Sequence, residues 1–370
     1  MMNPRAIPPI MPARSLDARY YTAPEIFIKE QDRLLARTWQ FAGHVSLLEK
    51  AGDYFTSEIA GQSLFCIRDR DGEVRTFYNV CQHRAHELLR GTGNSKLIVC
   101  PYHAWSYEIS GRLLNGPNIK AVPRLDRNDI CLEPVRTEVF LGFVFVNLDP
   151  DAKPMDEWFS RVRVELSEYV PHIERVKPLE WIEISEHCNW KVSVENYSEC
   201  YHCQINHETF STGVIKPETY DIQPQGYCLR HTTECQNLER MSYPIDLADN
   251  PCAGKYSSWF LWPTFSFQVY PGNVLNTYHW HPKGVDEVVV WRGWYTIEGA
   301  DSEVIRKLAA QDRATTVEED IQIVDSVQRG LKCRGYRPGP LVVDPDCGVN
   351  SEHSIQVLQQ WMREALDAQD

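Results

Sequence analysis

The chain has 370 residues, 43% of them hydrophobic and 24% charged, a composition that is typical of globular proteins and excludes a disordered or fibrous chain. Its length predicts two or three domains. Lys and Arg number 38 against 51 Asp and Glu, so the net charge is −13 and the basic surface that nucleic-acid binding requires is missing. No apolar run approaches the roughly 18 residues of a membrane span, and no secretory leader pattern is present. We therefore expect a cytoplasmic protein that binds neither nucleic acid nor membrane.

The secondary structure expected in the first half of the chain changes once, from a helix to short strands. Residues 22–39 have the apolar spacing of a helix, with Thr22 in the N-cap position and Pro24 early in the helix. Residues 41–148 alternate short apolar runs with Gly, Asp and Asn, which indicates a small antiparallel β domain. The segment from Asp149 to Pro154 is the expected boundary. We predict an N-terminal extension with a helix over 1–39, a β domain over 40–152 and a larger domain over 153–370.

The larger domain is predicted to be α+β. Residues 155–170 have helical spacing, and the strands are expected at 179–194, 226–235, 257–270, 275–282 and 287–297. A long helix is expected from about residue 302 to 331, and another from 351 to 368. Strands followed by helices indicate an antiparallel sheet packed against one or two helices.

Two loops of the β domain each contain one cysteine and one histidine. Twelve cysteines in a long chain without an export signal predict reduced thiols and metal ligands rather than a disulfide framework. Cys81 and His83 form C-x-H, and Cys100 and His103 form C-x-x-H sixteen residues later. Two Cys and two His can bind zinc, but zinc fingers usually open with two cysteines and close with two histidines. One of each per loop favours a [2Fe–2S] cluster with two thiolates on one iron and two imidazoles on the other. His86 is expected to be an ordinary loop residue.

The larger domain contains a second group of metal-binding residue types. The run that starts at Asn189 includes Asn196, Glu199, His202 and His207. Five positions on a helix rotate by about 140°, so the two histidines can share one metal only at a helix end or a bulge. Iron that activates O₂ is often held by two His and one carboxylate, so a distant acid is needed.

The long helix near the C-terminus offers that acid. Its acidic residues are Glu318, Glu319, Asp320 and Asp325. Its expected buried stripe is Val317, Ile321, Val324, Val327 and Leu331. Asp320 lies about 40° from Val324 on the buried side, whereas Glu319 lies about 140° away and should face water. Asp325, about 100° away on the other flank, is the main competitor. A buried acid is costly unless it is paired or binds a metal, which favours Asp320.

Together these motifs resemble the catalytic α subunit of Rieske non-haem iron oxygenases over nearly the whole chain. The resemblance implies a small Rieske domain followed by a helix-grip (START-like) catalytic domain. It implies that the [2Fe–2S] cluster is held by Cys81, His83, Cys100 and His103. It also implies that the mononuclear Fe²⁺ is held by His202, His207 and Asp320. We expect Asn196 to support the iron ligands.

One departure from the family pattern narrows the resemblance. The acid three positions before the first iron histidine bridges the two metal centres of neighbouring subunits in the family, and it is usually Asp. Here it is Glu199, within the sequence ENYSECYHC. This resembles the subgroup that oxidises quaternary ammonium compounds, such as carnitine and glycine betaine monooxygenases. The bridge between subunits implies a ring-shaped homotrimer.

The resemblance implies a terminal oxygenase that uses O₂ and electrons from a separate NAD(P)H-dependent reductase. No dinucleotide fingerprint occurs in the chain, so nicotinamide and flavin are expected only on that partner. The expected reaction hydroxylates a carbon next to nitrogen in a quaternary amine, followed by C–N cleavage or loss of formaldehyde. Two alternatives stay open. One is the same machinery acting on an aromatic acid or ether, and the other is a Rieske electron carrier fused to an inert ligand-binding domain.

Aromatic residues near the middle of the larger domain could form a cage for a trimethylammonium group. They crowd one expected strand and its successors: Trp259, Phe260, Trp262, Phe265, Phe267, Tyr270, Tyr278, Trp280, Trp291 and Trp294. Alternation along the strand predicts Trp259, Phe265 and Phe267 on one face, opposite Phe260, Trp262 and Tyr270. The sequence leaves open which face lines a pocket.

Overall fold

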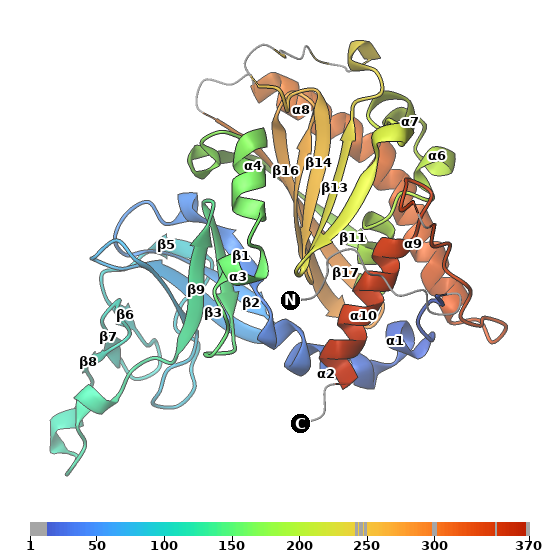
Figure 1. Cartoon of the computed structure of the whole chain (residues 1–370). Coiled ribbons are helices and arrows are strands. Elements are labelled where there is room, and N and C mark those ends of the chain that lie inside the picture. The colour runs from blue at the N-terminus through green and yellow to red at the C-terminus, as the bar shows by residue number, and fades with distance from the viewer. Residues whose placement is uncertain are drawn as a thin grey trace. The chain divides into compact units, whose positions relative to one another are not determined.

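A computed structural model of the chain describes residues 13–240, 243, 247, 250–297, 302–344 and 346–367. The chain divides into two compact units, residues 34–155 and residues 1–33 with 156–370 (Figure 1). Both units contain antiparallel sheets, and helices are concentrated in the second, so the predicted α+β class is confirmed. None of the helices in the described residues combines the length and apolar character needed to cross a bilayer.

The unit of residues 34–155 is built from two antiparallel sheets. The larger has the strand order β1-β10-β9-β4-β3-β2-β5, and the smaller has the order β6-β7-β8. The bounds are β1 Gln40–His44, β2 Asp53–Ile59, β3 Gln62–Arg68, β4 Val74–Tyr78, β5 Thr92–Asn94, β6 Ile98–Val99, β7 Ser106–Tyr107, β8 Leu113–Asn115, β9 Pro134–Phe140 and β10 Phe143–Asn147. Between the sheets, Phe65, Phe77 and Tyr107 pack in one buried cluster with Cys81 and Cys100. The two cysteines are therefore part of the core of this unit.

The other unit contains a single long sheet with the order β11-β17-β16-β15-β14-β13-β12, all antiparallel. The bounds are β11 Lys177–Glu186, β12 Asp221–Gln225, β13 Cys228–Glu234, β14 Lys255–Leu261, β15 Phe265–Tyr270, β16 Val274–Gly284 and β17 Glu287–Thr296. The single strand predicted over 257–270 is wrong, because a turn at Trp262 and Pro263 divides it into β14 and β15. The strand predicted over 179–194 ends at Glu186, since Asn189 caps a helix there by accepting the backbone N–H of Lys191.

The helical bounds are α1 Arg19–Thr22, α2 Pro24–Arg33, α3 Met155–Trp158, α4 Val162–Tyr169, α5 Trp190–Tyr197, α6 Cys203–Asn206, α7 Glu208–Gly213, α8 Ser302–Asp312, α9 Glu318–Leu331 and α10 His353–Asp367. Short 3₁₀ turns are η1 Leu35–Arg37, η2 Val45–Leu47, η3 Ile119–Ala121, η4 Arg127–Asp129, η5 Ile173–Arg175, η6 Pro217–Thr219 and η7 Leu238–Arg240. Thr22 ends α1 instead of capping a helix, because its hydroxyl donates to the carbonyl of Ala18. The helix predicted from 302 to 331 is interrupted by a π-helical turn, η8, at Arg313–Val317.

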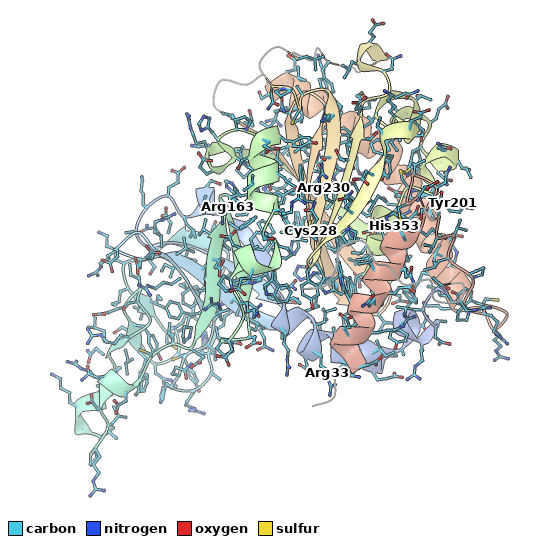
Figure 2. The ribbon with its side chains drawn as sticks, in the orientation of Figure 1. Arg33, Arg163, Tyr201, Cys228, Arg230 and His353 are labelled. Carbon is cyan, nitrogen blue, oxygen red and sulfur yellow. A yellow bond between two sulfur atoms is a disulfide. The ribbon has the colours of Figure 1, made fainter. Side chains whose placement is uncertain are left out.

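Helices cover both faces of the long sheet. On one face the indole of Trp259 donates to Glu165 of α4. On the other face Tyr270 donates to Asp312 of α8, and α5 contacts β16. The C-terminal helix α10 is fixed at the β12 edge, where the buried ring of His353 donates to the carbonyl of Ile222 (Figure 2). The face toward α5, α8 and α9 is the side of the second candidate site described below, to which α9 contributes Asp320.

Candidate metal centres

The two Cys–His loops of the residue 34–155 unit have the same backbone conformation. In each loop the cysteine N–H donates to the carbonyl five residues later, at 2.8 Å, and the cysteine carbonyl accepts the N–H four residues later, at 3.0 Å. The residue four positions after each cysteine has a positive φ, 55° at Ala85 and 54° at Ala104. The two cysteines therefore begin matching backbone turns, although their histidines follow at different spacings.

The side chains of these loops have the chemistry that a Rieske cluster needs. Cys81 and Cys100 are each 2% exposed, and the imidazole rings of His83 and His103 lie 4.7 Å apart at the surface side. The hydroxyl of Tyr107 lies 3.2 Å from the Cys81 sulfur. Buried sulfurs, with His83 exposed and His103 half-buried, fit a [2Fe–2S] cluster with its histidine-ligated iron toward the solvent. His86, set outside this group, contacts the carbonyl of Glu87.

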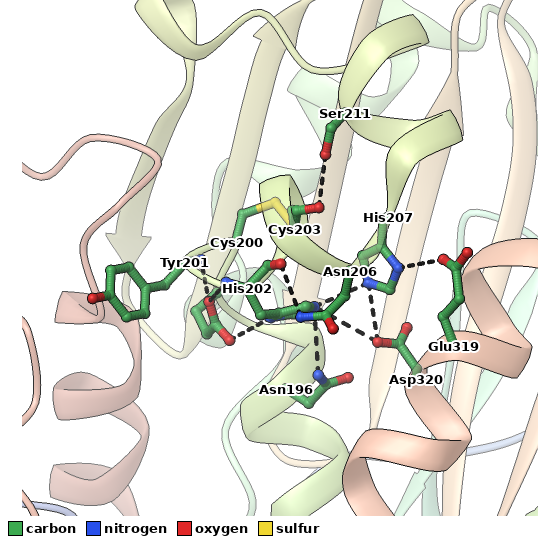
Figure 3. A network of polar contacts seen from close by, with 11 residues as sticks. Asn196, Cys200, Tyr201, His202, Cys203, Asn206, His207, Ser211, Glu319 and Asp320 are labelled. Atoms are coloured by element: carbon green, nitrogen blue, oxygen red, sulfur yellow. Dashed lines mark hydrogen bonds and ion pairs between the residues drawn. A yellow bond between two sulfur atoms is a disulfide. The ribbon is translucent and has the colours of Figure 1, made fainter.

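Three side chains in the residue 156–370 unit converge as a second candidate metal site. One ligand atom from each of His202, His207 and Asp320 lies within 4.8 Å of the others. The two Nε2 atoms are 3.0 Å apart, and Oδ1 of Asp320 lies 3.1 Å from Nε2 of His207 and 3.6 Å from Nε2 of His202 (Figure 3). That Oδ1 is buried without an aligned hydrogen bond. Two imidazoles and an orphaned carboxylate oxygen fit a divalent iron with open positions.

The backbone brings the two histidines together at helix ends, as their spacing required. His202 precedes α6, and His207 lies between α6 and α7 with φ −114° and ψ 75°. This break in the helix turns His207 back toward His202. Asp320 comes from the first turn of α9, immediately after the π-helical turn.

Glu199 and Asn196 both contact His202. Oε1 of Glu199 lies 2.5 Å from Nδ1 of His202, and its other oxygen accepts the backbone N–H groups of Tyr201 and His202. The side-chain amide of Asn196 is 3.5 Å from Nε2 of His202. Glu199 therefore fixes the ring from its outer edge, while Asn196 borders the side where the metal would bind.

Helical phase predicts that Glu319 faces water, whereas in the structure its carboxylate is partly exposed and also contacts a buried histidine. Its Oε2 lies 2.7 Å from Nδ1 of His207, and its side chain is 36% exposed. That expectation treats α9 as a helix with one buried face. In the structure α7 also lies against the η8 turn that leads into α9, so a second flank is covered there. Asp325, the competitor of Asp320, accepts the backbone N–H of His187 at 2.8 Å instead. Val327, predicted in the buried stripe, is 43% exposed.

The carboxylates around His202 and His207 shift the pKa values of these two histidines. Burial opposes a positive charge on His202, but the nearby carboxylates of Asp320 and Glu199 raise its pKa to about 10. The pKa of His207 is also raised by Asp320 and Glu319 against the effect of burial. Although burial would raise it, the pKa of Asp320 is lowered by the two histidines. The three side chains therefore stabilise a positive charge between them. A divalent cation that binds there supplies this charge and displaces protons from the histidines.

Aromatic rings and a buried ion pair line the same face of the sheet. Arg292, 1% exposed, pairs with Asp312, and its guanidinium carbon lies 3.9 Å from the ring centroid of Tyr278. The Tyr197 ring lies 4.7 Å from Tyr278 and 4.9 Å from Trp280. A cavity of about 50 Å³ between α7, α8 and η8 reaches Tyr270 and Asp312. The register Trp259↔Phe267 keeps Trp259, Phe265 and Phe267 on the opposite face, as alternation predicted.

One pair of cysteines differs from the expectation of reduced thiols. Cys200 and Cys203 form a disulfide that spans Tyr201 and His202. Both half-cystines are buried, at 2% and 4% exposure. A prediction from total cysteine count cannot identify such a pair, because the closeness of the two residues comes from the turn that leads into α6. The other cysteines are free.

Comparison with known families assigns both units. Residues 38–126 match the Rieske [2Fe-2S] domain, and residues 173–368 match the catalytic domain of the ring hydroxylating alpha subunit. The cluster loops lie in the first match, and His202, His207 and Asp320 lie in the second.

Individual proteins share most of the chain's length. A carnitine monooxygenase oxygenase subunit from Escherichia coli is 32% identical over 347 residues, covering 93% of this chain and 91% of that protein. The chloroplastic choline monooxygenase of Spinacia oleracea is 29% identical, covering 96% and 79%. The crystal structure of the quaternary ammonium Rieske monooxygenase CntA with L-carnitine has a TM-score of 0.84 and 28% identity, covering 96% of each chain. A naphthalene 1,2-dioxygenase from Rhodococcus sp. shares the fold, with a TM-score of 0.77 at 18% identity.

Proposed function

The chain belongs to the Rieske non-haem iron oxygenases, and we propose that it is the terminal component of a monooxygenase system for a quaternary ammonium compound. The reaction proposed is hydroxylation of a carbon next to nitrogen, with C–N cleavage or N-demethylation as the outcome. Support comes from the full-length similarity to carnitine monooxygenase subunits and to CntA bound to L-carnitine. Residues 40–152 would form the cluster domain and residues 153–370 the catalytic domain.

The proposed roles of the site residues follow from their contacts. Cys81, His83, Cys100 and His103 would hold the [2Fe–2S] cluster, and His202, His207 and Asp320 would hold the mononuclear iron. When bound, the cluster would supply electrons and the mononuclear iron would supply the position at which O₂ is reduced. The protein contributes the orientation of the imidazoles, since Glu199 accepts the Nδ1–H of His202 and leaves its Nε2 directed at Asp320.

Glu199 is proposed as the link between the iron site and the cluster of a neighbouring subunit in a homotrimer. Its Oε1 is engaged with His202, while the carboxylate as a whole is 12% exposed. Its second oxygen accepts two backbone N–H groups, but an ionised carboxylate offers about four acceptor positions, so it can still accept an imidazole N–H of a neighbouring subunit. Electrons would come from a separate NAD(P)H-dependent reductase.

Substrate recognition is proposed to rest on aromatic rings and buried acids on one face of the sheet. A trimethylammonium group carries positive charge but no N–H donor, so it is bound by ring faces and by nearby carboxylates without hydrogen bonds. Tyr197 lies next to Asn196 in sequence, and its ring contacts Tyr278 and Trp280. Burial raises the pKa of Glu186 to about 7, with Asp320 adding to the effect. A cation bound near Glu186 and Asp320 would help to keep these carboxylates ionised.

The test is a substrate screen with a competent reductase, following O₂ uptake together with released amine and formaldehyde. The panel contains carnitine, γ-butyrobetaine, glycine betaine, proline betaine and methoxy-aromatic acids. We expect coupled uptake and amine or formaldehyde release with at least one quaternary amine. Coupled turnover of a methoxy-aromatic acid, with none from any quaternary amine, would refute the substrate class and favour the aromatic alternative.

A further inference from the structure

His207 is contacted at both of its ring nitrogens by consecutive residues of α9. Its Nδ1 lies 2.7 Å from Oε2 of Glu319, and its Nε2 lies 3.1 Å from Oδ1 of Asp320 (Figure 3). The ring is thus held between two carboxylates whose backbones are neighbours in the first turn of one helix.

His202 also has a carboxylate on its Nδ1, and this carboxylate comes from a different part of the chain. Nδ1 of His202 lies 2.5 Å from Oε1 of Glu199, and its Nε2 lies 3.0 Å from Nε2 of His207. Each histidine of the site therefore has a glutamate on its outer nitrogen and directs the inner nitrogen to the shared centre.

We propose that Glu319 is a positioning residue for the mononuclear metal, which extends the proposed function and relies on its iron site. By accepting the Nδ1–H of His207, Glu319 selects the tautomer that has its lone pair on Nε2, facing Asp320. A neutral imidazole can bind a metal only through its unprotonated nitrogen, so this choice decides whether His207 is a ligand. A carboxylate partner also fixes the ring plane and increases the basicity of the ligating nitrogen.

Burial makes this contact more than a surface ion pair. The His207 side chain is 2% exposed, so an Nδ1–H that lost Glu319 would have little access to water. Glu319 is 36% exposed, which leaves its carboxylate partly hydrated while one oxygen stays on the ring. The preceding residue, Glu318, instead pairs with Arg313 at 3.1 Å and is 52% exposed. Two adjacent glutamates thus provide a matched comparison, one on the histidine and one on the surface.

The experiment compares Glu319→Ala and Glu319→Gln with wild type and with Glu318→Ala as the control. The mononuclear metal is removed by a chelator while the cluster is retained, and Fe²⁺ is titrated back. Occupancy is followed by the EPR signal of the ferrous–nitrosyl complex, which needs neither substrate nor reductase. We expect Glu319→Ala to weaken iron affinity by roughly 10- to 100-fold, the usual effect of losing such a partner. Glu319→Gln should stay closer to wild type, because its amide oxygen still accepts the Nδ1–H.

The shape of the EPR signal separates positioning from a general structural role. A ring that is free to rotate should broaden the signal in Glu319→Ala, whereas the cluster spectrum should be unchanged in every variant. Iron affinity in Glu319→Ala within twofold of wild type, or a loss in Glu318→Ala of the same size, would overturn the proposal. Because no substrate is present, failure of the quaternary amine hypothesis leaves this result unaffected, and the reverse also holds.

Discussion

Replacing Glu30 with Ala should destabilise the catalytic unit strongly, although the residue is far in sequence from the iron ligands. Glu30 of α2 is 0% exposed, and its Oε1 lies 2.5 Å from Nζ of Lys191, which is 3% exposed. Its other oxygen accepts the indole N–H of Trp190 at 2.9 Å. Lys191 and Trp190 begin α5, the helix that contains Asn196 and leads to Glu199 and His202.

The expected cost follows from what the substitution leaves behind. Removing one partner of a buried ion pair typically costs about 3–5 kcal/mol, because the remaining charge is buried without compensation. The indole N–H that loses its acceptor adds about 1–3 kcal/mol. Burial already lowers the pKa of Lys191, and Glu30 opposes that effect, so without Glu30 the lysine can reduce the penalty by losing its proton. We expect a net loss of about 3–5 kcal/mol, the range that buried-pair deletions give.

A double-mutant cycle measures this. Urea unfolding of Glu30→Ala, Lys191→Met and the double variant is followed by far-UV circular dichroism, with hydrogen exchange of the α5 amides as the local readout. The double variant should be less destabilised than the sum of the singles by about 3 kcal/mol, since it buries no unpaired charge. Glu25→Ala, an exposed acid in the first turn of α2, is the control and should change stability by no more than about 0.5 kcal/mol. Additive single effects, or a loss in Glu30→Ala no larger than in Glu25→Ala, would refute the reasoning.

Three further predictions concern the iron site and its surroundings. Asp320→Ala should lower the mononuclear iron content measured by metal analysis and leave the cluster spectrum intact. Asp325→Ala should retain iron, because the carboxylate of Asp325 contacts the backbone of His187 and not the iron site. The reverse ranking of iron contents would move the ligand to Asp325. Glu199→Ala, supplied with excess Fe²⁺ so that both metals are present, should slow the reoxidation of the reduced cluster by O₂ and substrate in stopped flow, and reoxidation at the wild-type rate would remove the linking role. Burial raises the pKa of Glu195 from 4.5 to about 7, so its ionisation should cost stability increasingly from pH 4.5 to pH 7, by up to about 3 kcal/mol. Glu195→Gln should lessen the fall in Tm over that window, and parallel wild-type and variant curves would contradict this.

The sequence predicted the parts of the site that depend on local spacing. The Cys–His loops are short and have matching turns, and the His202–His207 spacing required the helix ends that the structure contains. The phase of α9 relative to Val324 also placed Asp320 on the buried side, where Oδ1 lies 3.1 Å from His207. In each case neighbouring residues in sequence determine the geometry.

Features that depend on packing between distant segments could not be predicted in this way. Glu319 reaches His207 because α7 lies against η8, the turn that precedes α9, and the helical phase of α9 alone contains no information about this contact. The Cys200–Cys203 bond depends on the turn before α6. The contact between Glu30 and Lys191 joins residues 161 positions apart, and two charged side chains in amphipathic segments gave no sign of being buried.

The central claim is that this chain oxidises quaternary amines at the His202–His207–Asp320 site, and a single turnover without any reductase tests it most directly. The iron-loaded protein is reduced chemically, mixed with O₂ and carnitine or γ-butyrobetaine, and quenched for quantification of amine and formaldehyde. The account predicts that a quaternary amine accelerates oxidation of the cluster and yields product in an amount comparable to the protein, and that Asp320→Ala yields none. Product formation from a methoxy-aromatic acid with none from the quaternary amines, or undiminished product in Asp320→Ala, would contradict it.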